Sequence, residues 1–492
     1  MDFQKIKSFL KSNYIIILIL ITSLIIRIYY ISPIITWDES IYSNLGHDLS
    51  KNLLSYSFKD KGWSDFIPCG NNLNYCWPKA GFRAPLLPYL IAVFYFIKLE
   101  SLLAYLLPII GTLNILLVYI LGKSIFNKKV GIYAALLFGF LPLNIYYSTK
   151  ILTDELFIFL VILSFLFFWK GYEKNNNAYK VIFGASLALA LLSRYTLIWF
   201  IPVFFFYLLI RNKSLKFLKD EYLQYSILLF IILITPWLIY GWFSYGNPLG
   251  PFIHGQEASS YWGGSSPWYF FFEYSWKILS IAGPLFIATL LFLFYKKELK
   301  KKEFYFLILW IVIFFLMSFT SIHKEERYLL PIVPAICLIC GLFLSKLKRP
   351  YPILIICFCI IILLASSISY MGNLKKIDSN INSQCFIEIN NYLKNITGNF
   401  VTISENPPLL YYYTYRGGAY YPDPITEKSL NLSSSRNVTI YFVFTRLNSG
   451  FESEKFSIFK DILNKSYKKV FACPIDPEFN FIYSKNNPGY AV

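Results

Sequence analysis

The chain has 492 residues and a net charge of +18; 56% of its residues are hydrophobic, 20% are aromatic and 15% are charged. This composition excludes a soluble globular protein and predicts a polytopic α-helical membrane protein. The basic residues mostly separate the hydrophobic runs, which is typical of cytoplasmic loops and argues against a nucleic-acid-binding face. We therefore expect an integral protein of the cell membrane.

The first hydrophobic stretch, residues 14–33, is long enough to cross a bilayer and lacks a small-residue cleavage signature. It predicts a retained signal-anchor with the N-terminus in the cytoplasm, and loops rich in Lys and Arg delimit the later spans. About 11 transmembrane helices are expected, with a range of 11–13. The further stretches lie at about 101–122, 131–147, 155–170, 178–193, 195–210, 223–242, 276–295, 304–320, 328–345 and 351–370.

The segment Ala84–Lys98 is also apolar, but it is shorter than the roughly 20 residues that a crossing helix needs. Counting it as a span would put the later basic loops on the wrong side, so it is predicted to be a re-entrant or interfacial helix on the outer face. The first outer loop, 34–83, the later outer loop, 243–275, and everything after Tyr370 then lie outside the cytoplasm.

Residues 1–370 are predicted to form the membrane domain, and residues 371–492 a small extracytoplasmic, soluble α/β domain, because the tail becomes polar enough to fold in water. We expect helices near Ile387–Lys394 and Ser457–Asn464, and strands near Phe400–Ser404, Val438–Thr445, Lys469–Cys473 and Phe479–Tyr483.

Four of the eight cysteines fall on the predicted outer side. Cys69 and Cys76 share the first outer loop, and Cys385 and Cys473 bracket the tail. Each pair either forms a disulfide in an oxidising compartment or remains as thiols, and the sequence leaves both possibilities open.

Two acidic pairs are predicted at the outer membrane boundary. Asp38 and Glu39 follow the first span, and Asp154 and Glu155 stand at the mouth of a later one. Acidic residues are common where a span meets water, and Asp154 taken alone is explained more simply as the N-cap of its helix. Their common sidedness nevertheless predicts a shared pocket.

Three arginines are predicted on the same face: Arg83, Arg194 and Arg327, the last followed by Tyr328. Each one alone is explained by snorkelling toward lipid headgroups. Guanidinium groups bind phosphate in a fork geometry, so three of them beside four carboxylates indicate a site for a phosphate-bearing lipid.

The order of these motifs resembles the GT-C glycosyltransferases, and within them the branch of the dolichyl-phosphate-mannose protein mannosyltransferases and bacterial aminoarabinose transferases. The resemblance covers about residues 14–345. The motifs are Trp-Asp-Glu after the first span, Arg-Ala-Pro after the first loop, Asp-Glu at the second outer loop, Ser-Arg-Tyr, and Lys-Glu-Glu-Arg-Tyr-Leu-Leu-Pro before a late span.

The resemblance implies a catalytic membrane domain that moves a sugar, with inversion, from a polyprenyl or dolichyl phosphate to a hydroxyl of a glycan, lipid or protein on the outer face. Asp38 would be the general base, Glu39 would assist it, and Asp154 would shape the site or orient the acceptor. The predicted substrate-binding residues are Arg83, Arg194, Arg327, Tyr328 and Glu155. Ala84 intervenes between Arg83 and Pro85, a departure from relatives that leaves the direction of Arg83 open.

No cofactor is required by this scheme. A divalent metal on Asp38, Asp154 and Glu155, as in oligosaccharyltransferases, is possible but not expected, because the Trp-Trp-Asp-Tyr-Gly signature of that branch is absent. The alternatives are an oligosaccharyltransferase-like enzyme and a lipid-linked sugar transporter or flippase. A transporter is disfavoured because the charges gather at one boundary and no internal repeat is present. The sequence leaves the sugar and the acceptor open.

Overall fold

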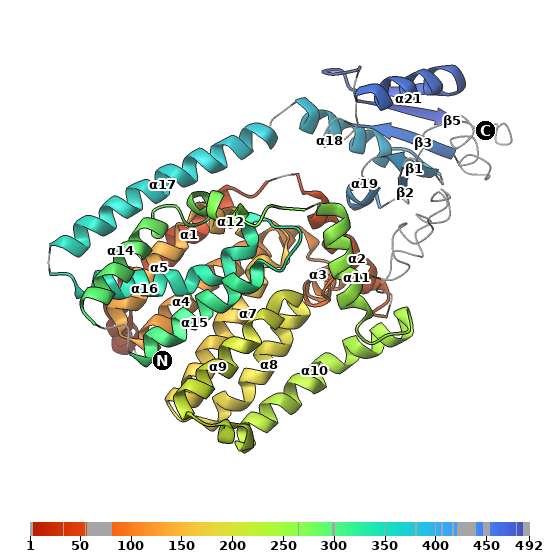
Figure 1. Ribbon diagram of the computed structural model, residues 1–492. Helices are drawn as coiled ribbons and strands as arrows, with labels where there is room; N and C mark the ends of the chain where they lie inside the picture. Colours follow the sequence, from red (N-terminus) through yellow and green to blue (C-terminus); the bar gives the residue numbers. More distant parts are fainter. Residues whose placement is uncertain are drawn as a thin grey trace. The chain divides into compact units, whose positions relative to one another are not determined.

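The computed structural model divides the chain into two compact units built from segments distant in sequence (Figure 1). The first comprises Met1–Ile31, Phe82–Leu87 and Leu99–Gly372, and the second comprises Ser32–Gly81, Pro88–Lys98 and Asn373–Val492. The domain boundary predicted at residue 370 stays a prediction. The structure describes residues 3–32, 34–54, 56, 81–263, 265–297, 301–348, 350–378, 381–398, 400–404, 407–415, 418–420, 439–445, 453–478 and 480–485.

Helices are the only regular secondary structure in the described part of the first unit. Its α-helices are α1 (Phe3–Tyr29), α4 (Leu103–Ile125), α5 (Lys128–Gly139), α6 (Pro142–Ser148), α7 (Thr153–Phe168), α8 (Asn177–Ser193), α9 (Ile201–Asn212), α10 (Glu221–Tyr245), α11 (Gly250–Gly263), α12 (Phe270–Glu273), α13 (Ser275–Leu279), α14 (Ala282–Tyr295), α15 (Lys302–Ser318), α16 (Val333–Lys346) and most of α17 (Tyr351–Asp378). Short turns of 3-10 or π-helix join them: η2 (Glu100–Leu102), η3 (Trp169–Glu173), η4 (Tyr195–Phe200), η5 (Leu215–Lys219) and η7 (Glu326–Ile332).

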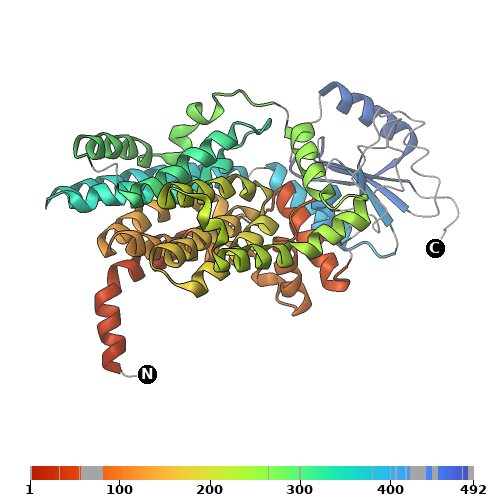
Figure 2. The same ribbon diagram turned by 60° about the horizontal axis from the view of Figure 1, so that its bottom comes forward.

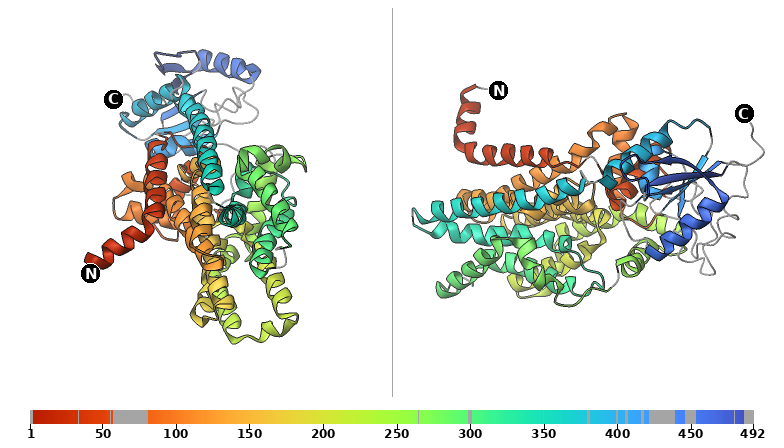
Figure 3. Two further views of the ribbon diagram at one scale, coloured as in Figure 1. Left: turned by 90° about the vertical axis from the view of Figure 1, so that its left-hand side faces the viewer. Right: turned by 90° about the horizontal axis from the view of Figure 1, so that it is seen from above.

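Seven helical segments among the described residues are long and apolar enough to cross a membrane, or eight if α5 and α6 form one broken span. These two helices meet at an angle of 69°, because Pro142 begins α6 and cannot continue the hydrogen-bonded ladder of α5. The polytopic membrane fold is confirmed, whereas the count of about 11 crossings stays a prediction. Figure 3 shows α17 as one continuous helix.

Glycines let the central helices of the first unit approach closely. A Cβ on Gly131 of α5 would lie 2.5 Å from the carbonyl oxygen of Tyr119 on α4, and one on Gly184 of α8 would lie 1.9 Å from that of Ser226 on α10. Small residues at helix contacts are typical of membrane bundles, where lipid supplies no hydrophobic drive for association. The backbones of α4 and α5, and those of α8 and α10, therefore pack directly on each other.

The second unit contains a five-stranded mixed sheet in the order β2-β1-β3-β5-β4. Its strands are β1 (Phe400–Ser404), β2 (Gly418–Tyr420), β3 (Thr439–Phe444), β4 (Lys468–Ala472) and β5 (Phe481–Lys485). β1 is parallel to β2 and β3, while β5 is antiparallel to β3 and β4. The expected small α/β fold of the tail is confirmed.

Alternating side chains give this sheet two apolar faces. On β3, Ile440 and Phe442 share a core with Leu463 of α21 (Ser453–Ser466), whereas Val443 packs on the other face with helices α18 (Ile381–Lys394) and α19 (Pro407–Thr414). Figure 2 shows α21 along one side of the strands.

A disulfide joins Cys385 of α18 to Cys473, directly after β4. One of the two bridges considered from the sequence is therefore present. Cys69 and Cys76 lie outside the described residues.

Two helices from the N-terminal part of the chain belong to the second unit. In α2 (Trp37–Lys51), Asn44 donates a hydrogen bond of 2.8 Å to the carbonyl oxygen of Pro408 on α19. A Cβ on Gly46 of α2 would lie 2.4 Å from the side chain of Ile91 on α3 (Leu86–Phe96), so these two helices touch across a glycine. The acidic pair of the first outer loop therefore lies on a packed helix.

Candidate functional site

Asp38 and Glu39 occupy the first turn of α2, but their environments differ. Glu39 is 2% exposed, and its Oε2 accepts a hydrogen bond of 2.7 Å from the backbone N–H of Thr36. Thr36 and Glu39 form a reciprocal capping box at the start of the helix. Asp38 is only half-buried. Of the two carboxylates, Asp38 is therefore the more exposed, and Glu39 caps the helix that carries it.

Asp154 is the centre of a charged cluster in the first unit. It lies in the first turn of α7 and is 2% exposed. Its Oδ1 pairs with Nη1 of Arg194, and its Oδ2 lies 3.7 Å from Nη1 of Arg327. The N-cap of α7 is Leu152, so the interpretation of Asp154 as an N-cap residue is wrong.

Arg327 holds a second carboxylate in the same cluster. Its Nε and Nη2 bond to the two oxygens of Glu325 at 2.7 and 3.0 Å, a bidentate arrangement that fixes the plane of the guanidinium. The ring of His323 and the hydroxyl of Tyr328 also contact Glu325, at 3.1 and 3.4 Å. The guanidinium carbon of Arg194 lies 5.0 Å from the centre of the Tyr328 ring.

The cluster strongly affects the charge state of Glu325. Burial by itself raises the pKa of this carboxyl, but the positive charges of Arg327 and Arg194, with hydrogen bonds from Arg327 and His323, outweigh it and lower the pKa below the ordinary value of 4.5. Glu325 is therefore ionised at neutral pH. Glu325 lies in the Lys-Glu-Glu-Arg-Tyr-Leu-Leu-Pro motif, but no role was predicted for it; its position two residues before Arg327 was the available signal.

The segment that carries Arg83 is tied to the residue that follows Arg194. The hydroxyl of Tyr195 donates a hydrogen bond of 2.8 Å to the carbonyl oxygen of Phe82 and accepts one of 3.1 Å from the indole N–H of Trp237. Arg83 and Arg194 thus each adjoin one end of the Phe82–Tyr195 hydrogen bond. The three arginines expected to act together belong to one compact unit.

Glu155 faces a different set of partners. It is fully buried, and its Oε2 accepts a hydrogen bond of 2.7 Å from Asn114. A Cβ on Gly111 would lie 3.3 Å from that oxygen and 3.2 Å from Nε of Arg27, so the buried Arg27 of α1 lies beside Glu155. This arrangement favours a role in helix packing. Arg27 was missed because it lies inside the apolar first span.

The predicted residues thus fall into three groups. Asp154, Arg194, Arg327 and Tyr328 come together, with Arg83 on the neighbouring segment. Glu155 lies with Arg27 and Asn114. Asp38 and Glu39 belong to the other unit, and the pocket predicted to join the two acidic pairs stays a prediction. Within the described part of the chain, no group of three or more His, Cys, Asp or Glu side chains could hold a metal ion.

Residues 82–240 match the family of dolichyl-phosphate-mannose-protein mannosyltransferases. A curated relative, GPI alpha-1,2-mannosyltransferase 3 of Xenopus laevis, is 23% identical over 213 residues, which are 42% of this chain and 37% of that protein. The match therefore spans little more than a third of the relative's length.

Solved structures extend the likeness to nearly the whole chain. ArnT of Cupriavidus metallidurans, bound to undecaprenyl phosphate, is 10% identical with a TM-score of 0.70, covering 96% of this chain and 98% of ArnT. The oligosaccharyltransferase AglB of Archaeoglobus fulgidus, in complex with an inhibitory peptide and a dolichol-phosphate, is 14% identical with a TM-score of 0.53 over 98% of this chain and 75% of AglB. The chain therefore has the fold of ArnT, as expected from the resemblance of its motifs to that branch.

Proposed function

We propose that the chain is an integral-membrane glycosyltransferase that moves a sugar from a polyprenyl or dolichyl phosphate to an acceptor hydroxyl on the extracytoplasmic face, with inversion. The observation that carries the proposal is the cluster of Asp154, Arg194 and Arg327 in a chain with the fold of ArnT, a protein solved with undecaprenyl phosphate. The match of residues 82–240 to the mannosyltransferase family supports the same reaction.

The arginines suit the leaving group of this reaction. Attack on the anomeric carbon passes through an oxocarbenium-like state and releases a lipid phosphate, which needs no general acid if its charge is stabilised. A guanidinium has five N–H donors, so one that bonds to a carboxylate can also bind a phosphate oxygen. In this proposal Asp154 orients Arg194 and Arg327. The two arginines bind the donor phosphate together with Tyr328 and Arg83.

Asp38 is proposed as the general base that removes the proton of the acceptor hydroxyl. Its half-buried carboxylate stands on a helix held by the capping box of Glu39 and by the packing of α2 on α19. A base on a rigid element is pre-positioned for the transfer step. Glu39 assists the reaction by fixing the start of α2 and so the position of Asp38.

The membrane topology is part of the proposal. Eleven crossings, with the N-terminus in the cytoplasm and the C-terminal domain outside, put the basic loops inside and the cluster around Asp154 on the outer face. The proposal requires no metal or other cofactor.

The test is the transfer of radiolabelled sugar from polyprenyl-phosphate mannose or polyprenyl-phosphate aminoarabinose to cell membranes by the purified protein. Asp38→Asn should fold normally and lose transfer by roughly 10²- to 10⁴-fold, the usual contribution of a general base. Arg83→Ala should chiefly weaken use of the donor. Glu100→Gln, at an exposed position in the first unit, is the matched control and should keep its activity.

Full activity of the Asp38→Asn protein would overturn the catalytic assignment. Movement of the intact lipid between leaflets without cleavage would favour the flippase. The likeness to AglB supports oligosaccharyl transfer as a second candidate; use of a lipid-linked oligosaccharide in place of both single-sugar donors, with loss of activity in a chelator, would favour it.

A further inference from the structure

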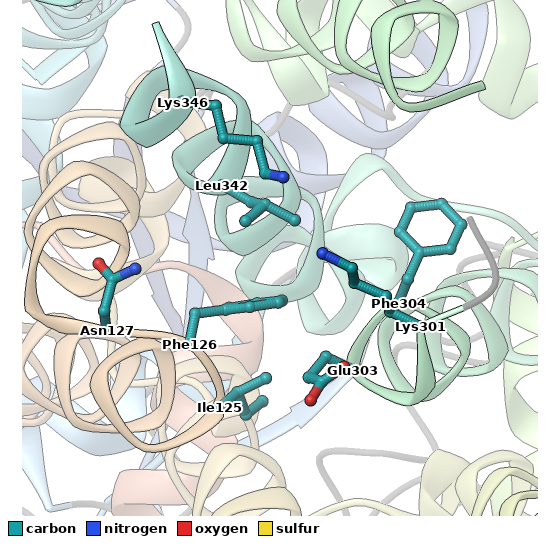
Figure 4. Close-up of a pocket in the computed structure, with 8 residues that line it drawn as sticks. All are labelled: Ile125, Phe126, Asn127, Lys301, Glu303, Phe304, Leu342 and Lys346. Atoms are coloured by element: carbon teal, nitrogen blue, oxygen red, sulfur yellow. The ribbon is translucent and has the colours of Figure 1, made fainter. Parts of the chain in front are cut away.

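A pocket of about 410 Å³ lies at one end of the helical bundle of the first unit, apart from the cluster around Asp154. It is formed by the end of α4, the start of α5, the start of α15 and the end of α16 (Figure 4). The residues that line it are Ile125, Phe126, Asn127, Lys301, Glu303, Phe304, Leu342 and Lys346.

The pocket and the cluster lie at opposite ends of one continuous helical segment. η7 and α16 run together from Glu326 to Lys346, which is 21 residues. At about 1.5 Å per residue this segment spans roughly 30 Å, the thickness of the hydrocarbon core of a bilayer. Arg327 at its start belongs to the cluster, and Lys346 at its end lines the pocket. The pocket therefore opens at the membrane surface opposite the one that the cluster faces.

The polar side of the pocket favours an anion. Figure 4 shows the ammonium groups of Lys301 and Lys346 directed toward the same space. An anion placed in this space would be attracted by both positive charges. Glu303 also lines the pocket, but it stands in the first turn of α15, where the helix dipole stabilises a negative charge by itself. The two lysines and one glutamate leave the lining with a net positive charge.

The other side of the pocket is apolar. Phe126, Leu342 and Ile125 line it, and Phe304 is a fourth apolar lining residue whose ring points away from the lysine ammonium groups. A free phosphate ion has nothing to place against such a wall, whereas a phospholipid has a phosphate headgroup joined to an apolar body. Basic pockets between membrane helices near a bilayer surface suit lipid headgroups of this kind.

We propose that this pocket binds the headgroup of an anionic phospholipid in the leaflet opposite the cluster around Asp154. The phosphate lies between Lys301 and Lys346, and the glycerol and first acyl carbons lie along Phe126 and Leu342. The site is independent of the proposed sugar transfer, since none of its residues belongs to the proposed reaction. Such a lipid fixes α4, α5, α15 and α16 to one another at their ends.

The experiment is a titration of the detergent-purified full-length protein with phosphatidylglycerol, with bound lipid counted by native mass spectrometry. The double variant Lys301→Gln/Lys346→Gln should bind the lipid at least tenfold more weakly, since a basic residue near a membrane surface contributes roughly 1 kcal/mol toward an anionic lipid. The matched control is Lys123→Gln/Lys348→Gln, which removes the same charge from exposed positions outside the pocket lining. Its affinity should fall clearly less than that of the pocket variant, because these two lysines do not line the pocket.

Glu303→Gln removes the negative charge of the lining and should make binding several-fold tighter, a change in the opposite direction. This variant decides the question if the double variant does not fold. Equal affinity of the two double variants, or no tightening by Glu303→Gln, would overturn the proposal. The third arm measures binding of soluble glycerol 3-phosphate. If it binds as tightly as phosphatidylglycerol, the pocket is a site for a free anion and the proposal is overturned.

Discussion

The ionised carboxylate of Glu325 stabilises the folded protein only while it carries its charge. Its pKa is lower in the folded state than the ordinary value of 4.5. The resulting stability is fully present above about pH 4.5. It is lost as the pH falls through the pKa of Glu325 in the folded state, because the carboxyl is then protonated in the folded and the unfolded protein alike. Glu325→Gln should therefore lower the unfolding temperature at pH 7, and the difference from the wild type should shrink below pH 4.5. Thermal unfolding of both proteins in detergent between pH 7 and pH 3 measures this difference in unfolding temperature.

The control for this prediction is Glu273→Gln. This acid stands at an exposed position on α12, and the same change of charge there should leave the pH dependence unaltered. A wild-type advantage that stays constant down to pH 3 would contradict the assignment of the stabilisation to the ionised carboxylate.

Individual charged residues of the cluster were partly predictable. Asp154, Arg194 and Arg327 stand out in the sequence because each lies at a span boundary, where a charge needs a partner. The pairing itself was not visible, since residues 154, 194 and 327 meet only through the packing of α7, α8 and η7. Glu155 was grouped with Asp154 in the sequence, but the structure gives it other neighbours. It adjoins Asp154 in sequence, but adjacent residues on a helix point in different directions, so it faces Asn114 and Arg27.

The start of α2 gives a test that separates structure from chemistry at the first acidic pair. Glu39→Ala removes the acceptor of the Thr36 backbone N–H and should destabilise the protein by about 0.5–2 kcal/mol, the usual cost of losing a helix cap. Glu39→Gln keeps an acceptor oxygen and should retain most of the stability and the sugar transfer. Chemical denaturation and the transfer assay measure the two effects. Loss of transfer in Glu39→Gln with full stability would show that the carboxylate itself takes part in the reaction.

The secondary structure was predicted best where one periodicity dominates. Strand β3 alternates strictly between two buried faces, and it was expected within one residue of its observed bounds. Helix α19 and strand β2 were missed, because a Pro-Pro start and a run of tyrosines between Leu410 and Thr414 carry no clear period. The predicted span at 131–147 is split at Pro142. A prediction from hydrophobicity alone misses this helix breaker.

The sequence does not show which segments make up each of the two units. Hydrophobicity locates helices but says nothing of which distant segments pack together, so the grouping of α2 and α3 with the C-terminal sheet was not expected. The contacts responsible are specific and polar as well as apolar: Asn44 with Pro408, and Tyr413 with the backbone N–H of Ile35 at 3.2 Å. The acidic pair of the first loop is consequently sensitive to the folding of the tail.

The disulfide tests this dependence. Cys385 and Cys473 are 88 residues apart, and closing so long a loop restricts the unfolded chain, so Cys385→Ser/Cys473→Ser should destabilise the second unit by about 2–5 kcal/mol. Dithiothreitol should lower the unfolding temperature of the wild type more than that of the double variant. Cys357→Ser, which removes an exposed free thiol, is the control and should respond to dithiothreitol as the wild type does. Because α2 packs on α19 within the same unit, the double variant should also lose sugar transfer at temperatures where the first unit remains folded. Identical unfolding of the wild type with and without reductant would show that the bridge does not hold this unit together.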